Sequence, residues 1–211
     1  MTLLGGGTVV PDRLMAALSL APRLVAADGG ANMAASAGLV PEYVIGDYDS
    51  VTAEALADLA PDRQIRIADQ DTTDFEKCLA LLSAPLILGL GFMGPRFDHT
   101  LAALGALVRF SAAPCILIGE DEVIFACPPR LTLDLPAGLR FSLFPLRPVT
   151  GTSTGLRWPI DGLTLAPDGR VGTSNETTGP VSLCLSGQGM LALLPHAGLD
   201  AAIRALRSAP R

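Results

Sequence analysis

Carboxylates gather in two short stretches of the sequence. The first stretch is VIGDYDS, residues 44–50, in which Asp47 and Asp49 directly follow an apolar run. The second stretch is DQDTTDFEK, residues 69–77, which carries four further acids: Asp69, Asp71, Asp74 and Glu76. Carboxylate oxygens are the ligands with which proteins hold Mg²⁺ together with substrate phosphates. The two stretches therefore point to a magnesium site for a phosphorylated ligand.

The spacing of the first pair has two explanations. In an extended segment residues two apart point the same way, so Asp47 and Asp49 would share one cation, and Gly46 would let the chain leave the strand sharply. An aspartate-rich turn without a metal explains the same pattern. D-x-D alone does not decide between them.

The second stretch favours the metal. Thr73 and Glu76 have the spacing of a capping box, which predicts a helix that starts at Asp74. Acids are favourable at a helix N-terminus, but that explains only one or two of the four. Lys77, the only lysine in the chain, either neutralises a neighbouring acid, contacts a phosphate, or does neither.

Two glycine-containing turns belong with these stretches. AADGGAN, residues 26–32, ends an apolar run with Asp28 and Gly29, and LGFMGPRFDHTL, residues 90–101, carries Arg96 and Asp98 before a predicted helix. Glycines and an arginine at a helix start suit a phosphate group. For His99, just inside that helix, a structural hydrogen bond is preferred over a role as catalytic base.

Up to residue 127 short apolar runs alternate with helical stretches. This alternation predicts a mainly parallel α/β sheet of the Rossmann-like kind, whose ligands bind beyond the carboxyl ends of the strands. The predicted strands are 2–4, 23–28, 43–47, 63–67, 85–91, 115–119 and 122–127, and the predicted helices are 12–20, 31–38, 52–60, 74–82 and 98–110.

After residue 127 the pattern changes to short, partly alternating runs separated by Pro, Gly, Ser and Thr, which is typical of an antiparallel β-sandwich. The predicted strands are 130–135, 140–146, 162–167, 181–186 and 190–195, followed by a helix over 197–209. Two prolines at 128–129 interrupt both patterns. We therefore predict an α/β catalytic domain over 1–127 and a β-sandwich domain over 128–211.

Composition excludes several classes of partner. The formal net charge of the 211 residues is −6, so no basic surface is expected for nucleic acid or an anionic membrane. No segment is long and apolar enough to span a membrane, and the N-terminus lacks the pattern of a signal peptide. The four cysteines are scattered, which argues against zinc and for buried thiols in a reducing compartment. We expect a cytoplasmic protein.

Taken together, DGGAN, GDYDS, DQDTTD and GPRFDHTLA closely resemble the thiamine pyrophosphokinase family in order and spacing. In the second half STGLRWPIDG, residues 153–162, and GTSNE, residues 172–176, resemble its thiamine-side motifs. The resemblance covers nearly the whole chain. Tyr48 stands where phenylalanine is usual, and Pro95 replaces a glycine, which removes one possible N–H contact to phosphate.

The resemblance implies a Mg²⁺-dependent transfer of pyrophosphate from ATP to the hydroxyethyl group of thiamine, giving thiamine diphosphate and AMP. It also implies a homodimer in which thiamine binds between the first domain of one subunit and the second domain of the other.

The residue roles then follow motif by motif. The expected metal ligands are Asp47, Asp49 and Asp74, with Asp71 as a further catalytic candidate. The expected contacts to the nucleotide or its phosphates are Lys77, Arg96 and Asp98, together with Gln70 and Thr73, which either bond the phosphates or orient the carboxylates. Asp28 and Gly29 are expected under the nucleotide or near the thiamine hydroxyl. Trp158, the only tryptophan, would by itself be taken for core packing, but the resemblance implies stacking on thiamine, with Ser174 and Asn175 contacting the pyrimidine. Either an aspartate accepts the proton of the acceptor hydroxyl or a metal lowers its pKa.

Three rival functions remain open at this point. A metal-dependent D-x-D nucleotide-sugar transferase explains GDYDS but leaves DQDTTD unused. A pyrophosphokinase acting on a pterin alcohol would share the metal site and differ in its second domain. A regulatory nucleotide-binding module would not need so many acids.

Overall fold

The structure is a computed structural model that describes residues 1–208. These residues form two compact units, each of which is described by itself. The first unit comprises residues 1–106 with 117–120, and the second comprises residues 107–116 with the described chain from residue 121. No helix within residues 1–208 is both long and apolar enough to cross a membrane.

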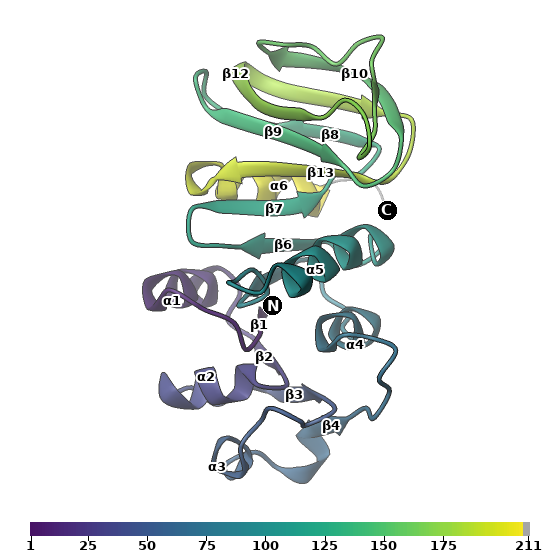
Figure 1. Cartoon of the computed structure of the whole chain (residues 1–211). Coiled ribbons are helices and arrows are strands. Elements are labelled where there is room, and N and C mark those ends of the chain that lie inside the picture. The colour runs from purple at the N-terminus through teal and green to yellow at the C-terminus, as the bar shows by residue number, and fades with distance from the viewer. Residues whose placement is uncertain (209–211) are drawn as a thin grey trace. The chain divides into compact units, whose positions relative to one another are not determined.

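The first unit is built on parallel strands in the order β5-β1-β2-β3-β4. Their bounds are β1 Thr2–Leu4, β2 Leu24–Ala27, β3 Tyr43–Gly46, β4 Gln64–Arg66 and β5 Ile87–Leu90. The helices are α1 Pro11–Leu20, α2 Gly30–Ser36, α3 Ala53–Leu56 and α4 Asp74–Leu81, with a 3-10 turn at Pro61–Arg63. Figure 1 shows α1 and α2 on one side of the strands and α4 on the other. The predicted parallel α/β architecture is confirmed.

The strands of this sheet are continuous apolar runs because helices cover both of its faces. Every residue of β1, β2 and β5 is buried. Parallel pairing also places the carboxyl ends of all five strands at one edge of the sheet. This edge, where Asp28, Asp47 and Gly91 follow their strands, is the edge at which the sequence predicts a ligand.

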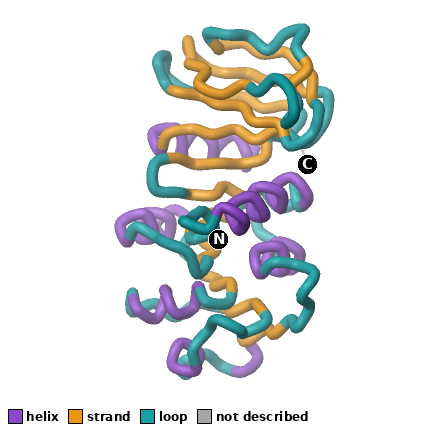
Figure 2. The backbone as a smooth tube through the Cα atoms, viewed as in Figure 1, coloured by secondary structure: helices purple, strands orange, loops and turns teal. Residues whose placement is uncertain are grey.

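The second unit is antiparallel. Its strands are β7 Glu122–Ala126, β8 Arg130–Leu133, β9 Arg140–Pro145, β10 Val149–Leu156, β11 Thr164–Leu165, β12 Gly172–Leu185 and β13 Met190–Pro195. A 3-10 turn at His196–Gly198 leads into helix α6 Leu199–Ser208. Helix α5, Phe97–Arg109, and strand β6, Cys115–Ile118, each contain residues of both units. In Figure 2 extended chain dominates the region from β7 onward.

Strand β12 belongs to both layers of the sandwich. Residues 172–176 pair with β9, which itself pairs with β13, and β13 pairs with β7. Residues 181–185 pair instead with β8 and β10. Gly179, with φ +152°, and Pro180 separate the two stretches, so one long strand serves two antiparallel sets. The predicted antiparallel β-sandwich is confirmed.

Two segments differ from the sequence expectations. Strand β10 and the first half of β12 had not been predicted, because runs of Thr, Ser and Gly there lack an apolar rhythm. The helix expected over 52–60 is only the four-residue α3, which has no buried residue to stabilise it and ends before Pro61. The C-terminal helix forms as expected, although residue 209 lies outside the described residues.

Candidate active site

A cavity of about 790 Å³ opens at the carboxyl edge of the parallel sheet. It lies within the first unit, and its walls come from the loops after β1, β2, β3 and β5 and from the start of α4. Among the predicted site residues, the cavity is lined by Asp28, Gly29, Asp47, Thr73, Asp74, Lys77 and Arg96. This volume is in the range of small-molecule sites.

A glycine loop that had not been singled out from the sequence forms one wall of this cavity. Gly5, Gly6 and Gly7 follow β1 directly, and the N–H groups of Gly5 and Gly7 donate to the carbonyls of Leu90 and Gly91. A Cβ at Gly5 or Gly7 would lie 2.7 Å from the Gly91 carbonyl oxygen. Side chains are therefore excluded, and backbone itself faces the cavity. The sequence signal that could have predicted this loop was the run of three glycines directly after an apolar strand.

Three carboxylates meet at this edge: Asp28 after β2, Asp47 after β3 and Asp74 at the start of α4. One oxygen atom of each lies within 4.8 Å of the others, which is close enough for one cation to bind all three. Gly46 makes this convergence possible, because a Cβ there would lie 2.7 Å from the Asp28 Cβ and 3.1 Å from Asp74 Oδ1. Its role is to leave space for the carboxylates.

Asp28 is the most enclosed of the three. Its Oδ2 accepts a hydrogen bond from the Ser50 N–H at 3.0 Å, whereas its buried Oδ1 has no hydrogen-bond partner. Burial raises the pKa of Asp28, hydrogen bonds from Ser50 oppose the shift, and the charge of Asp74 adds to it. A buried, unpartnered carboxylate oxygen beside two other carboxylates is the donor set that a hard cation satisfies.

Asp47 is held on both oxygens. Its Oδ1 accepts from the Asp49 N–H at 3.2 Å, and its Oδ2 accepts from Gln70 Nε2 at 3.0 Å and from Lys77 Nζ at 3.4 Å. Burial alone would raise the pKa of Asp47, but these hydrogen bonds and the Lys77 charge outweigh it and lower the pKa. Asp47 is thereby kept ionised.

The expectation that Asp47 and Asp49 lie on an extended stretch is wrong. Strand β3 ends at Gly46, and Tyr48 between the two aspartates has φ +69°. The chain turns there, so Asp49 lies outside the group of three and its Oδ1 accepts from Ser50 Oγ at 2.6 Å. The group instead includes Asp28, which the sequence had placed under the nucleotide or near the thiamine hydroxyl.

Lys77 is buried beside the group of three. Its Nζ donates to Asp74 Oδ1 at 3.0 Å and to Asp47 Oδ2 at 3.4 Å, and only 2% of its side chain is exposed. Burial would lower the pKa of Lys77, but the hydrogen bond and charge of Asp74, with those of Asp47, raise it overall. The lysine therefore stays charged among the acids.

The helix predicted to start at Asp74 begins there, with the complete capping box between Thr73 and Glu76. Because Thr73 Oγ1 accepts from the Glu76 N–H at 3.3 Å, the hydroxyl serves the helix end. Asp71 is exposed and is not a member of the group of three. The box fixes the first turn of α4 and with it the direction of Asp74.

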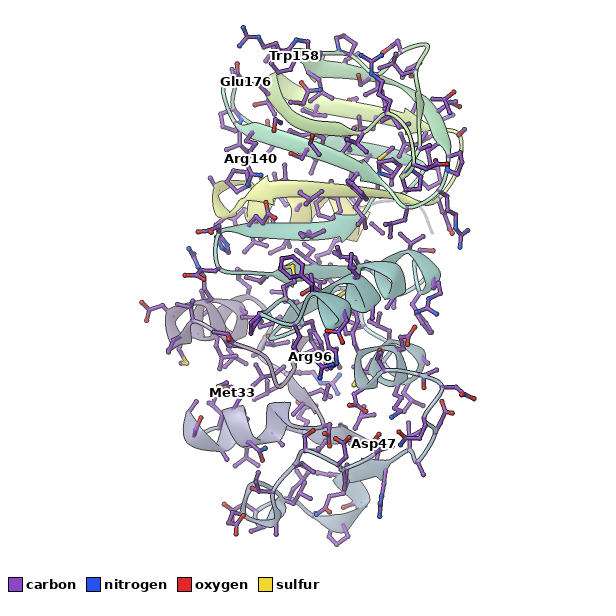
Figure 3. The ribbon with its side chains drawn as sticks, viewed as in Figure 1. Met33, Asp47, Arg96, Arg140, Trp158 and Glu176 are labelled. Carbon is purple, nitrogen blue, oxygen red and sulfur yellow. The ribbon has the colours of Figure 1, made fainter. Side chains whose placement is uncertain are left out.

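The loop after β5 places Arg96 on the cavity wall. Arg96 Nη2 donates to Asp98 Oδ2 at 2.7 Å and Arg96 Nε donates to Asp98 Oδ1 at 3.3 Å, in an exposed pair. His99 also lines the cavity. Figure 3 shows Arg96 and Asp47 as labelled side chains of this unit. Among the residues that line the cavity, Arg96 thus adds an exposed cation, paired with Asp98, to the buried lysine.

Asn32 and Ser50 were not singled out from the sequence, although both lie in the quoted motifs. Asn32 Nδ2 donates to the Ser50 carbonyl at 2.9 Å, and Asn32 Oδ1 accepts from the Thr52 N–H at 2.9 Å. Asn32 therefore clamps the loop whose Ser50 N–H holds Asp28. Their signal was their place in the motifs, Asn32 at the end of DGGAN and Ser50 at the end of GDYDS.

Backbone strain falls on the same motifs. Within residues 1–208 the non-glycine residues with positive φ are Asp28, Tyr48 and Ser174, with φ of 41°, 69° and 60°. Each costs conformational free energy, and such residues gather at functional sites. One lies in each of the motifs DGGAN, GDYDS and GTSNE.

In the second unit Trp158 follows β10 and 54% of the residue is exposed, so it is not part of the core. Arg157 lies over its ring, 5.0 Å from the centroid, and pairs with Glu176 at 3.6 Å. Figure 3 shows Trp158 and Glu176 near one another. Part of the aromatic surface is therefore open to solvent even with Arg157 over the ring, and charges of both signs lie beside it.

Asn175 is buried and fixes the backbone of Trp158. Its Oδ1 accepts from the Trp158 N–H at 3.1 Å and from the Glu176 N–H at 2.9 Å, and its Nδ2 donates to the Trp158 carbonyl at 2.7 Å. Ser174, by contrast, is exposed. Of the predicted thiamine-side residues, Asn175 therefore contacts Trp158, whereas the Ser174 N–H donates to Ser142 Oγ at 3.0 Å.

Comparisons with known proteins agree over both units. The family described as thiamin pyrophosphokinase, catalytic domain, matches residues 14–118, and the family described as thiamin pyrophosphokinase, vitamin B1 binding domain, matches residues 131–183. Thiamine pyrophosphokinase 1 of Oryza sativa subsp. japonica is 31% identical over 154 residues, which are 64% of this chain and 58% of the rice protein. The chain thus spans less than two thirds of that relative.

Solved structures share the fold. Thiamin pyrophosphokinase from Candida albicans has a TM-score of 0.77 at 17% identity, covering 92% of this chain and 89% of that one. Thiamine pyrophosphokinase from Bacillus subtilis has a TM-score of 0.73 at 22% identity, covering 92% and 97%. These similarities extend over both units.

Proposed function

Because the chain belongs to the thiamin pyrophosphokinase family, we propose that it transfers the pyrophosphoryl group of ATP to the hydroxyethyl group of thiamine. The products are thiamine diphosphate and AMP. The observation that carries this proposal is the group Asp28, Asp47 and Asp74 on a cavity wall, with a buried carboxylate oxygen that has no partner. A transfer of this kind asks a protein to position phosphates and neutralise their charge.

We assign Mg²⁺ to this group of carboxylates. The donor set fits a hard cation, because all three ligands are carboxylates and one buried oxygen, Asp28 Oδ1, has no hydrogen-bond partner. Asp49 and Asp71 are retained as additional candidates nearby. When bound, the ion supplies Lewis-acid chemistry to the phosphate oxygens. Gln70 supports it indirectly by holding Asp47 Oδ2.

The nucleotide is assigned to the cavity of the first unit. Arg96 contacts phosphate and Asp98 orients its guanidinium, because the two are joined by two hydrogen bonds. The backbone of the glycine loop at residues 5–7 and of Gly29 lets the phosphates approach closely. Thr73 and Lys77 act through the aspartates, since Thr73 caps α4 and Lys77 pairs with Asp47 and Asp74.

Thiamine is assigned to the exposed ring of Trp158, because a cationic aromatic ligand stacks favourably on tryptophan. Ser174 is exposed and offers a hydroxyl to the pyrimidine. Asn175 acts through Trp158, whose backbone it holds. The acceptor hydroxyl loses its proton either to an aspartate of the group or with help from the metal.

We further propose a homodimer with shared active sites, an α/β domain over 1–127, a β-sandwich domain over 128–211 and residence in the cytoplasm. The four free cysteines fit a reducing compartment. Co-refolding Asp74→Asn and Trp158→Ala chains tests the shared site, because mixed dimers would regain one intact site. At a thiamine concentration far below the KM of the Trp158→Ala chain, about a quarter of wild-type activity is then expected. Recovery no greater than the mean of the separate variants, with exchange confirmed, contradicts sharing.

Product analysis tests the reaction. The protein is incubated with ATP and Mg²⁺, with thiamine, a hydroxymethyl pterin or no acceptor, and the nucleotides are resolved by chromatography. We expect AMP in a 1:1 ratio with thiamine diphosphate and only with thiamine. ADP together with a thiamine monophosphate would overturn the pyrophosphoryl assignment, and AMP formed only with the pterin would overturn the acceptor.

A further inference from the structure

A buried cation already occupies the group of carboxylates. The Lys77 ammonium lies 3.0 Å from Asp74 Oδ1 and 3.4 Å from Asp47 Oδ2, and its side chain is 98% buried. Lysine is rarely buried unless it is paired. Since Lys77 is the only lysine among 211 residues, the fold places its single ammonium group at this point.

The contacts divide the carboxylate oxygens into two sets. Lys77 takes one oxygen each of Asp47 and Asp74, whereas the buried Oδ1 of Asp28 has no partner. One ammonium therefore bridges two carboxylates and does not reach the third, whose Oδ1 has no partner. The group is held together, but its charge is only partly neutralised.

Counting charges shows how much negative charge the group of carboxylates keeps once Lys77 is included. If all three carboxylates are ionised they carry −3, and the one ammonium that contacts them leaves −2, which is the charge that one divalent cation neutralises. We propose that Lys77 is a positioning residue that holds Asp47 and Asp74 in place before the metal binds and limits the site to one divalent cation of moderate affinity. This inference rests on the proposed magnesium site.

The same contacts allow two simpler roles. If Lys77 only stabilises the fold through its salt bridges, its loss destabilises the protein equally with and without metal. If it contacts a nucleotide phosphate, its loss weakens ATP binding and leaves the binding of Mg²⁺ alone unchanged. A positioning cation predicts a different result, because the carboxylates then depend on Mg²⁺ for their neutralisation.

The test compares wild type and Lys77→Met, a neutral side chain of similar length, by thermal unfolding and by calorimetric titration with MgCl₂ alone. Ionic strength is held constant with NaCl. We expect Lys77→Met to have a lower Tm without Mg²⁺, and a Mg²⁺-induced rise in Tm that exceeds the wild-type rise by at least about 3 °C. The Kd for Mg²⁺ should become at least about tenfold tighter, because a nearby positive charge has been removed.

Arg66→Met is the matched control. Arg66 is exposed and its Nε donates to the backbone carbonyl of Asp47 at 3.1 Å, so it is a nearby cation that contacts no carboxylate of the group. Its Mg²⁺-induced rise in Tm should stay within about 1 °C of the wild-type rise. If the Mg²⁺-induced rise in Tm increased equally in Arg66→Met and Lys77→Met, the loss of any nearby positive charge would explain the effect. That result would overturn the inference.

A double-mutant cycle guards against simple loss of folding. In Lys77→Met/Asp74→Asn one repelling carboxylate is also removed, so the metal-free Tm should recover part of the loss seen in Lys77→Met. Additive losses would contradict the inference. If Lys77→Met folds only in the presence of Mg²⁺, this result gives the inference its strongest support.

The outcomes separate the two proposals. A wild-type protein whose Tm and calorimetric signal do not respond to Mg²⁺ overturns both the metal site and the role of Lys77. A different result overturns only the role of Lys77. In that case the wild type binds Mg²⁺, and Lys77→Met shows the same Kd for Mg²⁺ and the same Mg²⁺-induced rise in Tm.

Discussion

The two units hold their candidate site residues in opposite ways. In the first, charged side chains partner one another: Lys77 bridges Asp47 and Asp74 within a largely buried cluster. In the second, the Trp158 ring is exposed and only its backbone is fixed, by the buried amide of Asn175. The first arrangement is organised before any ligand arrives, and the second presents a surface that a ligand must cover. This difference fits the proposal that the first unit performs the chemistry and the second selects the acceptor.

The largest effect is expected from the carboxylates. Asp47→Asn or Asp74→Asn should each lower kcat about 10³-fold, because a lost metal ligand removes several kcal/mol of transition-state stabilisation. Asp49→Asn should cost less, since Asp49 lies outside the group of three. Steady-state AMP formation at saturating Mg²⁺ measures this. Equal losses in Asp49→Asn and Asp47→Asn would restore the D-x-D pair as the metal site.

A smaller and different effect is expected at Trp158. Trp158→Ala should raise the KM for thiamine about 30-fold, which corresponds to about 2 kcal/mol of stacking, and leave the KM for ATP unchanged. Trp158→Phe, which keeps an aromatic face, is the matched control and should lose less. A rise in the KM for both thiamine and ATP would contradict the proposal that the second unit binds only the acceptor.

Asn175 tests whether the tryptophan needs its support. Asn175→Ala leaves the Trp158 and Glu176 N–H groups without their acceptor, so stability should fall by about 2 kcal/mol. The KM for thiamine should rise less than in Trp158→Ala. Urea unfolding and thiamine titration measure the two effects. Unchanged stability with a KM as high as in Trp158→Ala would make Asn175 a direct ligand contact instead.

The smallest effect is expected from the cap of α4. Thr73→Ala removes the hydroxyl of the capping box and should lower the free energy of unfolding by about 1 kcal/mol. Activity should stay within about threefold of wild type, because Asp74 keeps its place in the first turn. Thr73→Ser retains the hydroxyl and should behave as wild type. A loss of activity far beyond threefold without a loss of stability would assign Thr73 to phosphate binding.

The sequence predicts the first unit well for a physical reason. Buried parallel strands are unbroken apolar runs, and the acids that follow them stand out against those runs. The start of α4 was predictable because Thr73 and Glu76 carry their own local signal. Strand β10 carries no such signal, since Thr, Ser and Gly occupy most of it and pairing with β12 decides its conformation.

The composition of the proposed metal site was only partly predictable. Spacing placed Asp47 and Asp49 together, whereas the positive φ of Tyr48 separates them and parallel pairing brings in Asp28 from β2. The burial of Lys77 and the clamp by Asn32 also depend on contacts between distant residues. The exposure of Trp158 likewise depends on the fold rather than on its neighbours in sequence.

One kinetic comparison tests most directly the proposed division between chemistry in the first unit and acceptor binding in the second. It compares the rate of AMP formation, extrapolated to saturating thiamine, in Trp158→Ala and in Asp74→Asn. Trp158→Ala should approach the wild-type kcat once thiamine is abundant, because only acceptor binding is weakened. Asp74→Asn should remain about 10³-fold slow at any thiamine concentration. A Trp158→Ala kcat as low as that of Asp74→Asn, or an Asp74→Asn rate restored by thiamine, would contradict the account.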